Sequence, residues 1–99
     1  MATIINPSTL APPKGYSNGV LYEGGRILFV AGQVGWDNNE KCVAGLTAQF
    51  GLALDNILDV VREAGGDAGD VGRMTIYVVD KDEYIREAQA IGAEYRKRM

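Results

Sequence analysis

Histidine is absent from this chain of 99 residues, and its absence removes several classes of site chemistry. Ser-His-Asp and Cys-His nucleophile arrangements need an imidazole as general base, so neither can be assembled here. Zinc sites with His or mixed Cys and His ligands are excluded for the same reason. Any acid–base chemistry must therefore fall to Tyr, Asp, Glu, Lys, Cys42 or a positioned water.

Disulfides, long apolar runs and an excess of basic charge are also missing. The single cysteine, Cys42, cannot form an internal disulfide. No apolar run approaches the ~18 residues of a membrane span, and the N-terminus lacks the pattern of a signal peptide. Thirteen acidic against ten basic side chains give a net charge of -3, which argues against a nucleic-acid or anionic-membrane partner. We therefore expect a cytoplasmic protein that binds neither nucleic acid nor membrane.

The remaining composition is that of a folded protein. Hydrophobic residues make up 46% of the chain and charged residues 23%, which predicts one ordered domain over residues 1–99. A chain of this length buries only a modest core. Contacts between subunits would add useful burial, so we expect assembly.

The N-terminal half predicts strands followed by a long helix. Residues 1 to about 15 carry proline and turn signals that indicate irregular backbone or an edge strand. Val20–Glu23 and Arg26–Gly32 are predicted as the strands of a hairpin with a turn at Gly24-Gly25. An amphipathic helix is predicted from apolar residues at spacings of three and four, namely Leu46, Phe50, Ala53, Leu54, Ile57, Val60, Val61 and Ala64.

The C-terminal half predicts a strand and a second helix, giving the order ββαβα. Gly65-Gly66 supply the stop signal of the first helix, and Arg73–Val79 is predicted as a central strand. Asp80 or Asp82 can cap the second helix, in which Tyr84, Ala88, Ile91 and Tyr95 repeat at helical spacing.

The expected arrangement is a right-handed parallel βαβ connection with both helices on one sheet face. Thr75, Tyr77 and Val79 would then point to the other face. They are too apolar to face water on a central strand, so we expect a second subunit or a missing segment to cover them.

Several short motifs together carry a family resemblance. They are Asn6-Pro7, Gly15-Tyr16-Ser17, Gly24-Gly25-Arg26, the run Phe29–Gly35, the helix segment Gln49–Asn56, the turn Ala64-Gly65-Gly66 with Asp70-Val71, and the strand Thr75–Val78. In this order the motifs resemble the Rid (YjgF) family of small proteins. The resemblance covers nearly the whole chain.

The resemblance implies an α+β, chorismate-mutase-like fold with a mixed β-sheet, assembled as a homotrimer with ligand clefts between subunits. It implies hydrolysis of reactive enamines and imines, such as 2-aminoacrylate, to 2-oxo acids and ammonia, without metal or organic cofactor. The alternative is a trimeric binding or chaperone-like protein that holds a small carboxylate-bearing ligand without turnover. RNA cleavage, also linked to this family, fits poorly with an acidic chain that lacks histidine.

The resemblance also assigns candidate site residues. Tyr16 matches a position where a phenol can orient the substrate or a water, although its hydroxyl could instead simply face solvent. Gly32 and Gln33 match the strand end that borders the cleft. Ala31 stands where the deaminase branch commonly has a serine, so that hydroxyl is missing here.

A carboxylate-bearing substrate needs a guanidinium, because its planar fork makes two charge-assisted hydrogen bonds. Arg73 is the preferred candidate and Arg26 the other, and an ion-pair or solvated role is the alternative for each. Trp36 is expected as an interface anchor or a cleft wall. The chain ends at Met99, before the family's last strands, where the family's own carboxylate-binding arginine and water-positioning glutamate lie.

Overall fold

The computed structural model of the chain describes residues 2–14 and 16–99. Met1 and Gly15 lie outside the described residues, so the first residue of the Gly15-Tyr16-Ser17 motif is not placed. The elements in chain order are β1 (Ala2–Ile5), β2 (Gly19–Tyr22), α1 (Leu46–Glu63), the 3-10 helix η1 (Ala68–Asp70), α2 (Lys81–Arg86) and α3 (Ala88–Arg98).

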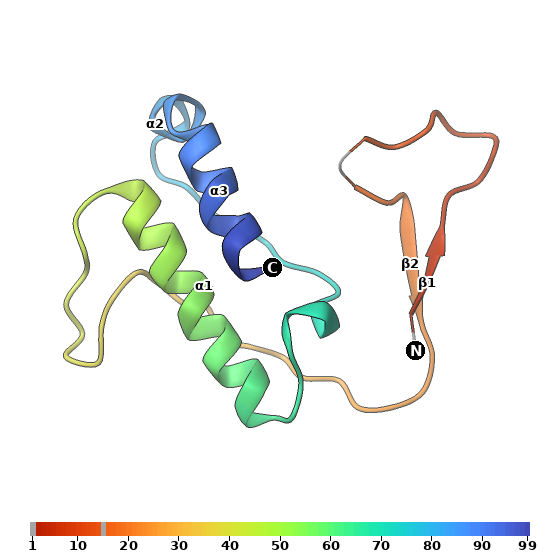
Figure 1. Cartoon of the computed structure of the whole chain (residues 1–99), viewed down its shortest axis with the longest axis horizontal. Coiled ribbons are helices and arrows are strands. Elements are labelled where there is room, and N and C mark those ends of the chain that lie inside the picture. Colours follow the sequence, from red (N-terminus) through yellow and green to blue (C-terminus); the bar gives the residue numbers. More distant parts are fainter. Residues whose placement is uncertain (1, 15) are drawn as a thin grey trace.

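The helices and the sheet stand side by side (Figure 1). The helices pack together on one side, and the strands β1 and β2 form a separate ribbon on the other. The radius of gyration is 15.4 Å, above the ~13 Å typical of a chain this long, because the sheet extends away from the helices. None of the described helices combines the length and the apolar composition needed to cross a membrane.

The long predicted helix is confirmed as α1, and its C-terminus is closed as the sequence predicts. Gly65 has a φ of 92°, which a residue with a side chain rarely adopts. The Gly65 amide donates to the Arg62 carbonyl, and the Gly66 amide donates to the Val61 carbonyl. These two bonds form a Schellman motif, which satisfies carbonyls that would otherwise lack partners at the helix end.

The core lies between α1 and α3. Leu54, Leu58, Val61 and Ile91 are its buried hydrophobic residues, and Leu58 is only 1% exposed. The stripe that packs on α3 repeats at spacings of three and four, as packed helices require. Leu58 was not among the positions expected from the periodicity, whereas the expected Val60 and Ala64 are exposed. The position of α3 selects which apolar stripe of α1 is buried.

The predicted second helix is interrupted at Glu87. Its backbone, with φ -100° and ψ 11°, separates α2 from α3. Asp80, one of the two predicted caps, begins α2, because its carboxylate accepts from the amides of Asp82 and Glu83 at 3.0 and 3.1 Å. The Thr47 hydroxyl donates to the Glu87 carboxylate at 2.5 Å and so ties the interruption to α1.

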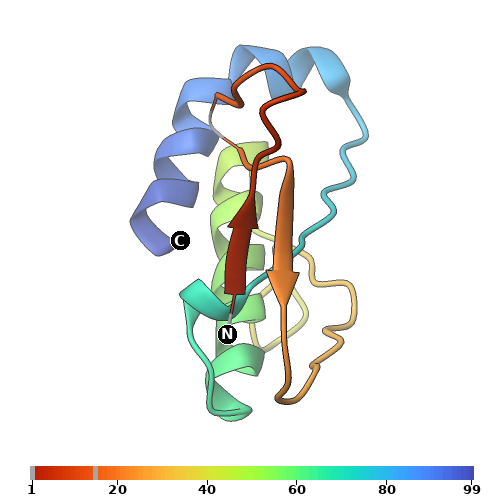
Figure 2. The ribbon, with the colours of Figure 1, turned by 90° about the vertical axis from the view of Figure 1, so that its right-hand side faces the viewer.

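The sheet differs from the predicted hairpin. β2 confirms a strand close to Val20–Glu23, but it pairs antiparallel with β1, from Ala2 opposite Tyr22 to Ile5 opposite Gly19 (Figure 2). An edge strand near the N-terminus was one of the two expectations for residues 1–15. Gly24 and Gly25 have φ values of 68° and 78°, which suit a tight turn. Arg26–Gly32 nevertheless leaves β2 and runs toward α1, so the predicted pairing is wrong.

The predicted strands Arg26–Gly32 and Arg73–Val79 form no ladder with the described residues, so the order ββαβα and the parallel connection are also wrong. β-branched and aromatic residues favour extended backbone, but a strand needs a partner about 4.8 Å away. The α+β character of the chain is confirmed. Tyr77 and Val79 lie exposed on their segment, so no part of the described chain covers them.

Arg98 joins the end of α3 to the middle of α1. Its Nε donates to Asp55 Oδ1 at 2.7 Å, and its Nη1 donates to Glu94 Oε2 at 2.5 Å. The hydrogen bonds to Asp55 and Glu94 raise the pKa of Arg98 above its ordinary value. The hydrogen bond from Arg98 lowers the pKa of Glu94, and the nearby charge of Lys97 acts in the same direction. Arg98 therefore links a carboxylate of α1 to one of α3.

Replacing Leu58 by alanine tests the core. We expect Leu58→Ala to lower the free energy of unfolding by about 2–5 kcal/mol, because it removes a fully buried side chain and leaves a cavity. Ile85→Ala is the control, since Ile85 is 59% exposed and should change stability by less than about 0.5 kcal/mol. Urea denaturation followed by circular dichroism measures both. Equal losses would contradict the assignment of the core.

Acid should weaken the contact of Arg98 with Glu94. Because the folded-state pKa of Glu94 is lowered, its contribution is complete above the ordinary carboxyl pKa and is lost as pH falls through the lowered value. The stability difference between the unchanged chain and Arg98→Gln should therefore be larger at about pH 7 than at about pH 3. Chemical denaturation at both pH values measures it, with Arg96→Gln as the control. A difference independent of pH would contradict the pairing.

Candidate functional site

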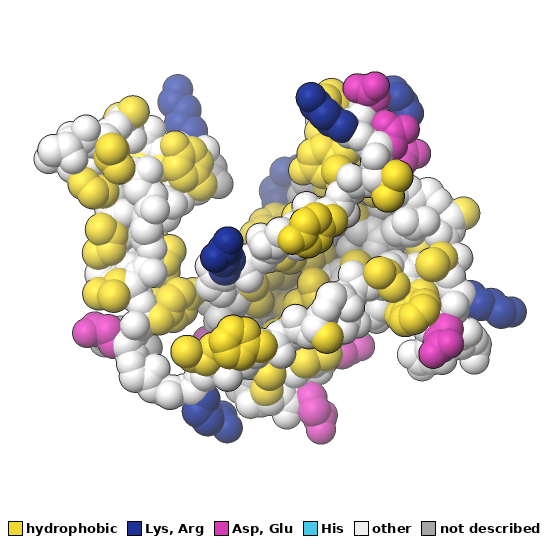
Figure 3. Space-filling model, turned by 180° about the vertical axis from the view of Figure 1, so that it is seen from behind, with side chains coloured by type: hydrophobic (Ala, Val, Ile, Leu, Met, Phe, Trp, Pro, Cys, Tyr) yellow, Lys and Arg dark blue, Asp and Glu magenta, His cyan; other side chains and the backbone are white. Residues whose placement is uncertain are grey.

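A groove between α1 and two extended segments is the candidate site. Residues 33–35 form one wall, residues 74–78 form the other, and α1 provides the floor. The groove has a volume of about 310 Å³ and carries no charged side chain among its lining residues. Figure 3 shows the molecule from behind, and on this face a hollow is bordered by hydrophobic side chains. Its size and lining suit a small molecule.

Of the sequence-predicted binding residues, Gln33 lies in a wall of the groove, whereas Ala31, Gly32 and Arg73 lie next to the walls and do not line it. Ala31, Gly32 and Gln33 lead into the first wall, and the Gln33 amide donates to the Ala31 carbonyl at 3.3 Å. Gln33 itself lines the groove. Arg73 directly precedes Met74, where the second wall begins, and Arg73 is exposed. The structure therefore brings the segments that carry these four residues to one groove.

Tyr16 is not brought to the groove within one chain. It lies in the loop between β1 and β2 and is 64% exposed. The amide of Asn18 donates to the Asn6 side chain at 2.8 Å and so closes the base of this loop. Figures 1 and 2 both show the loop separated from the extended segment that precedes α1. Tyr16 and Gln33 therefore do not share a site within one chain.

Two amide side chains on α1 hold the first wall in place. The Asn56 amide donates to the carbonyls of Val34 and Trp36 at 3.1 and 3.2 Å. The Gln49 amide donates to the Val43 carbonyl at 2.9 Å. Gly35 is buried between them, and a Cβ there would lie 2.4 Å from the Cα of Gln49. Only glycine permits this approach of wall to helix.

The role of Asn56 and Gln49 was missed by reasoning from the sequence. They appear there only as the two ends of the helix segment Gln49–Asn56 in the family resemblance. The sequence offered one indication of a shared role, namely their spacing, because residues seven apart lie on the same side of a helix. Which backbone groups they meet depends on the path of a loop that the sequence pattern does not specify.

Beyond the first wall, residues 35–43 fold back as a tight loop. Val43 donates to the Gly35 carbonyl at 2.9 Å, and Trp36 is paired with Cys42 across the loop. The Asp37 carboxylate accepts from the amides of Asn39 and Lys41 at 2.8 and 3.1 Å. The loop thus carries Trp36, which is 40% exposed, close to the end of the first wall.

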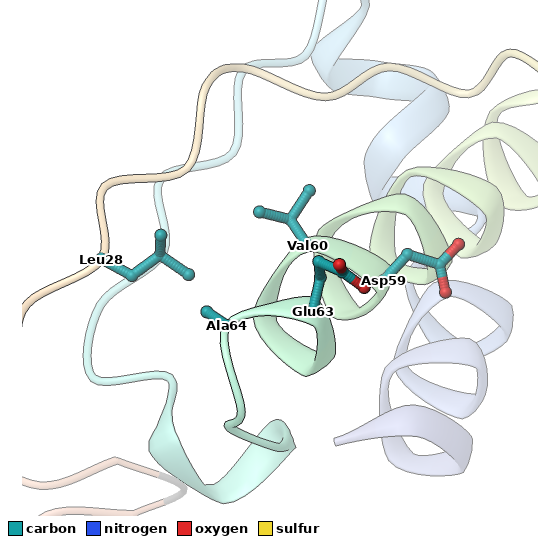
Figure 4. A pocket seen from close by; sticks show the side chains of 5 residues that line it. All are labelled: Leu28, Asp59, Val60, Glu63 and Ala64. Carbon is teal, nitrogen blue, oxygen red and sulfur yellow. The ribbon is translucent and has the colours of Figure 1, made fainter.

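A second hollow lies beside the C-terminal part of α1 (Figure 4). Leu28 points across it toward Val60 and Ala64, and Asp59 and Glu63 complete the lining. Its volume is about 550 Å³, but it is wide open. The two carboxylates would repel an anionic ligand. The groove at Gln33 is therefore the better candidate for a carboxylate-bearing molecule.

The groove can bind and orient a ligand through neutral polar groups. Gln33 offers an amide and Tyr84 a phenol, beside an apolar floor. Across residues 2–14 and 16–99, no three His, Cys, Asp or Glu side chains gather closely enough to hold a metal ion. The arrangement supports hydrogen bonding to a ligand, and a charged partner for it would have to come from beside the groove.

The comparisons with known proteins agree with the sequence motifs. A family model described as Endoribonuclease L-PSP matches residues 7–99. A RutC family protein from Sulfurisphaera tokodaii is 28% identical over 99 residues, covering 98% of this chain and 77% of that protein. No solved structure matches. Because the family model covers nearly the whole chain, the protein belongs to the Endoribonuclease L-PSP family, the Rid (YjgF) family that its sequence motifs resemble.

Proposed function

We propose that this protein hydrolyses small reactive enamines and imines that carry a carboxylate, releasing the 2-oxo acid and ammonia. One observation carries the proposal: in a chain of this family, Gln33 and the segment that follows Arg73 line a single groove. The groove has the size of a small ligand and a lining that excludes charge. Family membership by itself leaves the reaction open, because one fold serves many activities.

The proposed reaction requires few catalytic groups from the protein. An enamine is protonated on carbon to give an iminium, water adds to the iminium carbon, and the C–N bond breaks as ammonia leaves. No nucleophilic side chain is needed, so the lack of histidine is no obstacle. Positioning and general acid–base help supply the acceleration, the latter about 10²- to 10⁴-fold.

Each candidate residue has a role in this proposal. Arg73 binds the substrate carboxylate through its planar guanidinium, with Arg26 as the other candidate. The backbone at Ala31 and Gly32, together with Gln33, borders the reacting end of the substrate. Tyr16 orients the attacking water or moves a proton to and from it. No metal or organic cofactor takes part in the proposed reaction.

Tyr16 can reach the groove only in an assembly, so the proposal includes a homotrimer with a chorismate-mutase-like arrangement of subunits. The exposed apolar side chains support an assembly. Phe29 and Tyr77 are 89% and 92% exposed, and Val79 is fully exposed. Exposed large apolar side chains in this number are typical of a surface that a partner covers. The Tyr16 loop of one subunit would then close the groove of its neighbour.

The second candidate is a binding protein without turnover. Ala31 favours it, because the family's deaminase branch commonly carries a serine hydroxyl at this position. Such a protein would hold the same small carboxylate in the same groove. It would lack a group that helps transfer protons.

Replacing Tyr16 by phenylalanine separates the two candidates. We expect the unchanged protein to accelerate the loss of 2-aminoacrylate generated in situ, and Tyr16→Phe to lower kcat by about 10²-fold, since it removes only the phenolic hydroxyl. Formation of the 2-oxo acid in a coupled assay measures the rate. Tyr95→Phe is the control, because Tyr95 lies on α3 outside the groove.

Other outcomes have distinct meanings. No acceleration by the unchanged protein, combined with saturable binding of pyruvate, would replace the enzyme with the binding protein. Acceleration that survives Tyr16→Phe would keep the enzyme but remove Tyr16 from its mechanism.

The proposed assembly is tested in solution. We expect sedimentation equilibrium to give about three times the 10.7 kDa of one chain. Val79→Glu should shift the protein toward single chains, because it places a charge on the fully exposed apolar face that assembly would bury. Lys81→Glu, on the exposed start of α2, is the charge-changing control. A compact single chain at all concentrations would contradict the trimer.

A further inference from the structure

We propose that Asn56 and Gln49 act together as an amide clamp that positions Gln33 for the reaction. The amide clamp is defined as these two α1 side chains and their hydrogen bonds to the carbonyls of Val34, Trp36 and Val43. The inference rests on the proposed function, because it concerns the wall that would border the substrate. Asn56 does not line the groove, and Gln49, which lines its floor, uses its amide on the Val43 carbonyl, so both are proposed as positioning residues.

Asn56 fixes both ends of a very tight turn. The Trp36 amide donates to the Val34 carbonyl at 2.9 Å, which closes a three-residue γ-turn around Gly35. The single Nδ2 of Asn56 donates to the Val34 carbonyl and to the Trp36 carbonyl. An amide nitrogen has two hydrogens, so both of its donors are used. No other neutral side chain of this size offers two donors from one atom.

Gln49 holds the returning arm of the same loop. It precedes Asn56 by seven residues and therefore lies on the same side of α1, two turns away. Its amide donates to the Val43 carbonyl, while Val43 donates back to the Gly35 carbonyl. Gly35 is seated against the Gln49 backbone, where a Cβ would not fit. The loop is thus held on α1 at Val34 and Trp36, at Val43, and at the turn around Gly35.

The clamp determines where Gln33 lies. Gln33 is bonded directly to Val34, whose carbonyl Asn56 holds, so the direction of the first wall follows from this contact. The hydrogen bonds of Asn56 are exposed to solvent, and exposed bonds contribute little to the stability of the whole fold. A displacement of about 1 Å at a reacting site can nevertheless lower the rate about 10²-fold. Positioning is therefore the larger consequence of the clamp.

Trp36 makes the clamp observable without any substrate. It is the only tryptophan of the chain, and its carbonyl is one of the two that Asn56 holds. Asn56→Asp keeps the shape of the side chain but replaces both donors with a carboxylate that the two carbonyls repel. We expect the fluorescence of Trp36 to shift to longer wavelength and to become more accessible to acrylamide at about pH 8.

The pH profile distinguishes positioning from a general structural effect. When the introduced carboxyl is protonated it can donate one hydrogen bond, so the emission of Asn56→Asp should return toward that of the unchanged chain as pH falls. Asn38→Asp is the matched control, because it adds the same charge at the exposed tip of the same loop. The emission wavelength of Asn38→Asp should equal that of the unchanged chain at every pH.

The effect of the clamp on activity is measured with the assembled protein and 2-aminoacrylate. We expect kcat of Asn56→Asp to fall about 10²-fold at about pH 8 and to recover partly toward acid, in parallel with the emission. If the unchanged protein shows no turnover, the proposed function fails. The fluorescence of Trp36 would still show whether Asn56 holds the loop in place. Gln49→Glu provides the second variant should Asn56→Asp not fold, with the same readouts.

Three results would overturn the inference. The emission of Asn56→Asp could remain that of the unchanged chain at every pH, which would show that the loop does not depend on the clamp. The emission could shift while kcat stays the same, which would show that the clamp positions nothing. Both variants could lose their helical circular dichroism, which would make the role purely structural.

Discussion

The contact of α1 with α3 holds the helical part of this chain together, and the candidate site is built on it. Leu54, Leu58 and Val61 bury one stripe of α1 against Ile91, and Arg98 fastens the outer edge of the contact to Asp55. Most of the stability of a helix in a protein comes from such burial of its apolar face. With this burial, α1 is held in place, and the segments that form the groove can pack against it.

The other sides of α1 are used for the site. Residues of α1 that include Gln49 form the floor of the groove, and the amides of Gln49 and Asn56 hold the loop that follows the first wall. A site built on a helix is held more firmly than one built on loops alone. The wall that carries Gln33 is itself irregular backbone, so its geometry depends on these side-chain hydrogen bonds rather than on a β-ladder.

The extended segments are also a reason for proposing an assembly of copies. Arg26–Gly32 and Arg73–Val79 carry many apolar side chains that the described chain does not cover, and the loop between β1 and β2 is separated from the extended segment that precedes α1. Both features would be met by the proposed assembly, which the family resemblance implies. The chemistry proposed for the groove suits these residues, because hydrolysis of an imine requires orientation and proton transfer but no imidazole.

Much of this protein was determined by the sequence alone. The family, the long helix from Leu46, its end at Gly65 and the cap at Asp80 follow from local patterns, because periodicity, caps and turns depend on neighbouring residues. Strand pairing, the burial of Leu58 and the contacts of Asn56 were decided only by the tertiary structure. Each of these depends on which distant segment lies alongside, and extended propensity in Arg26–Gly32 carries no information about its partner.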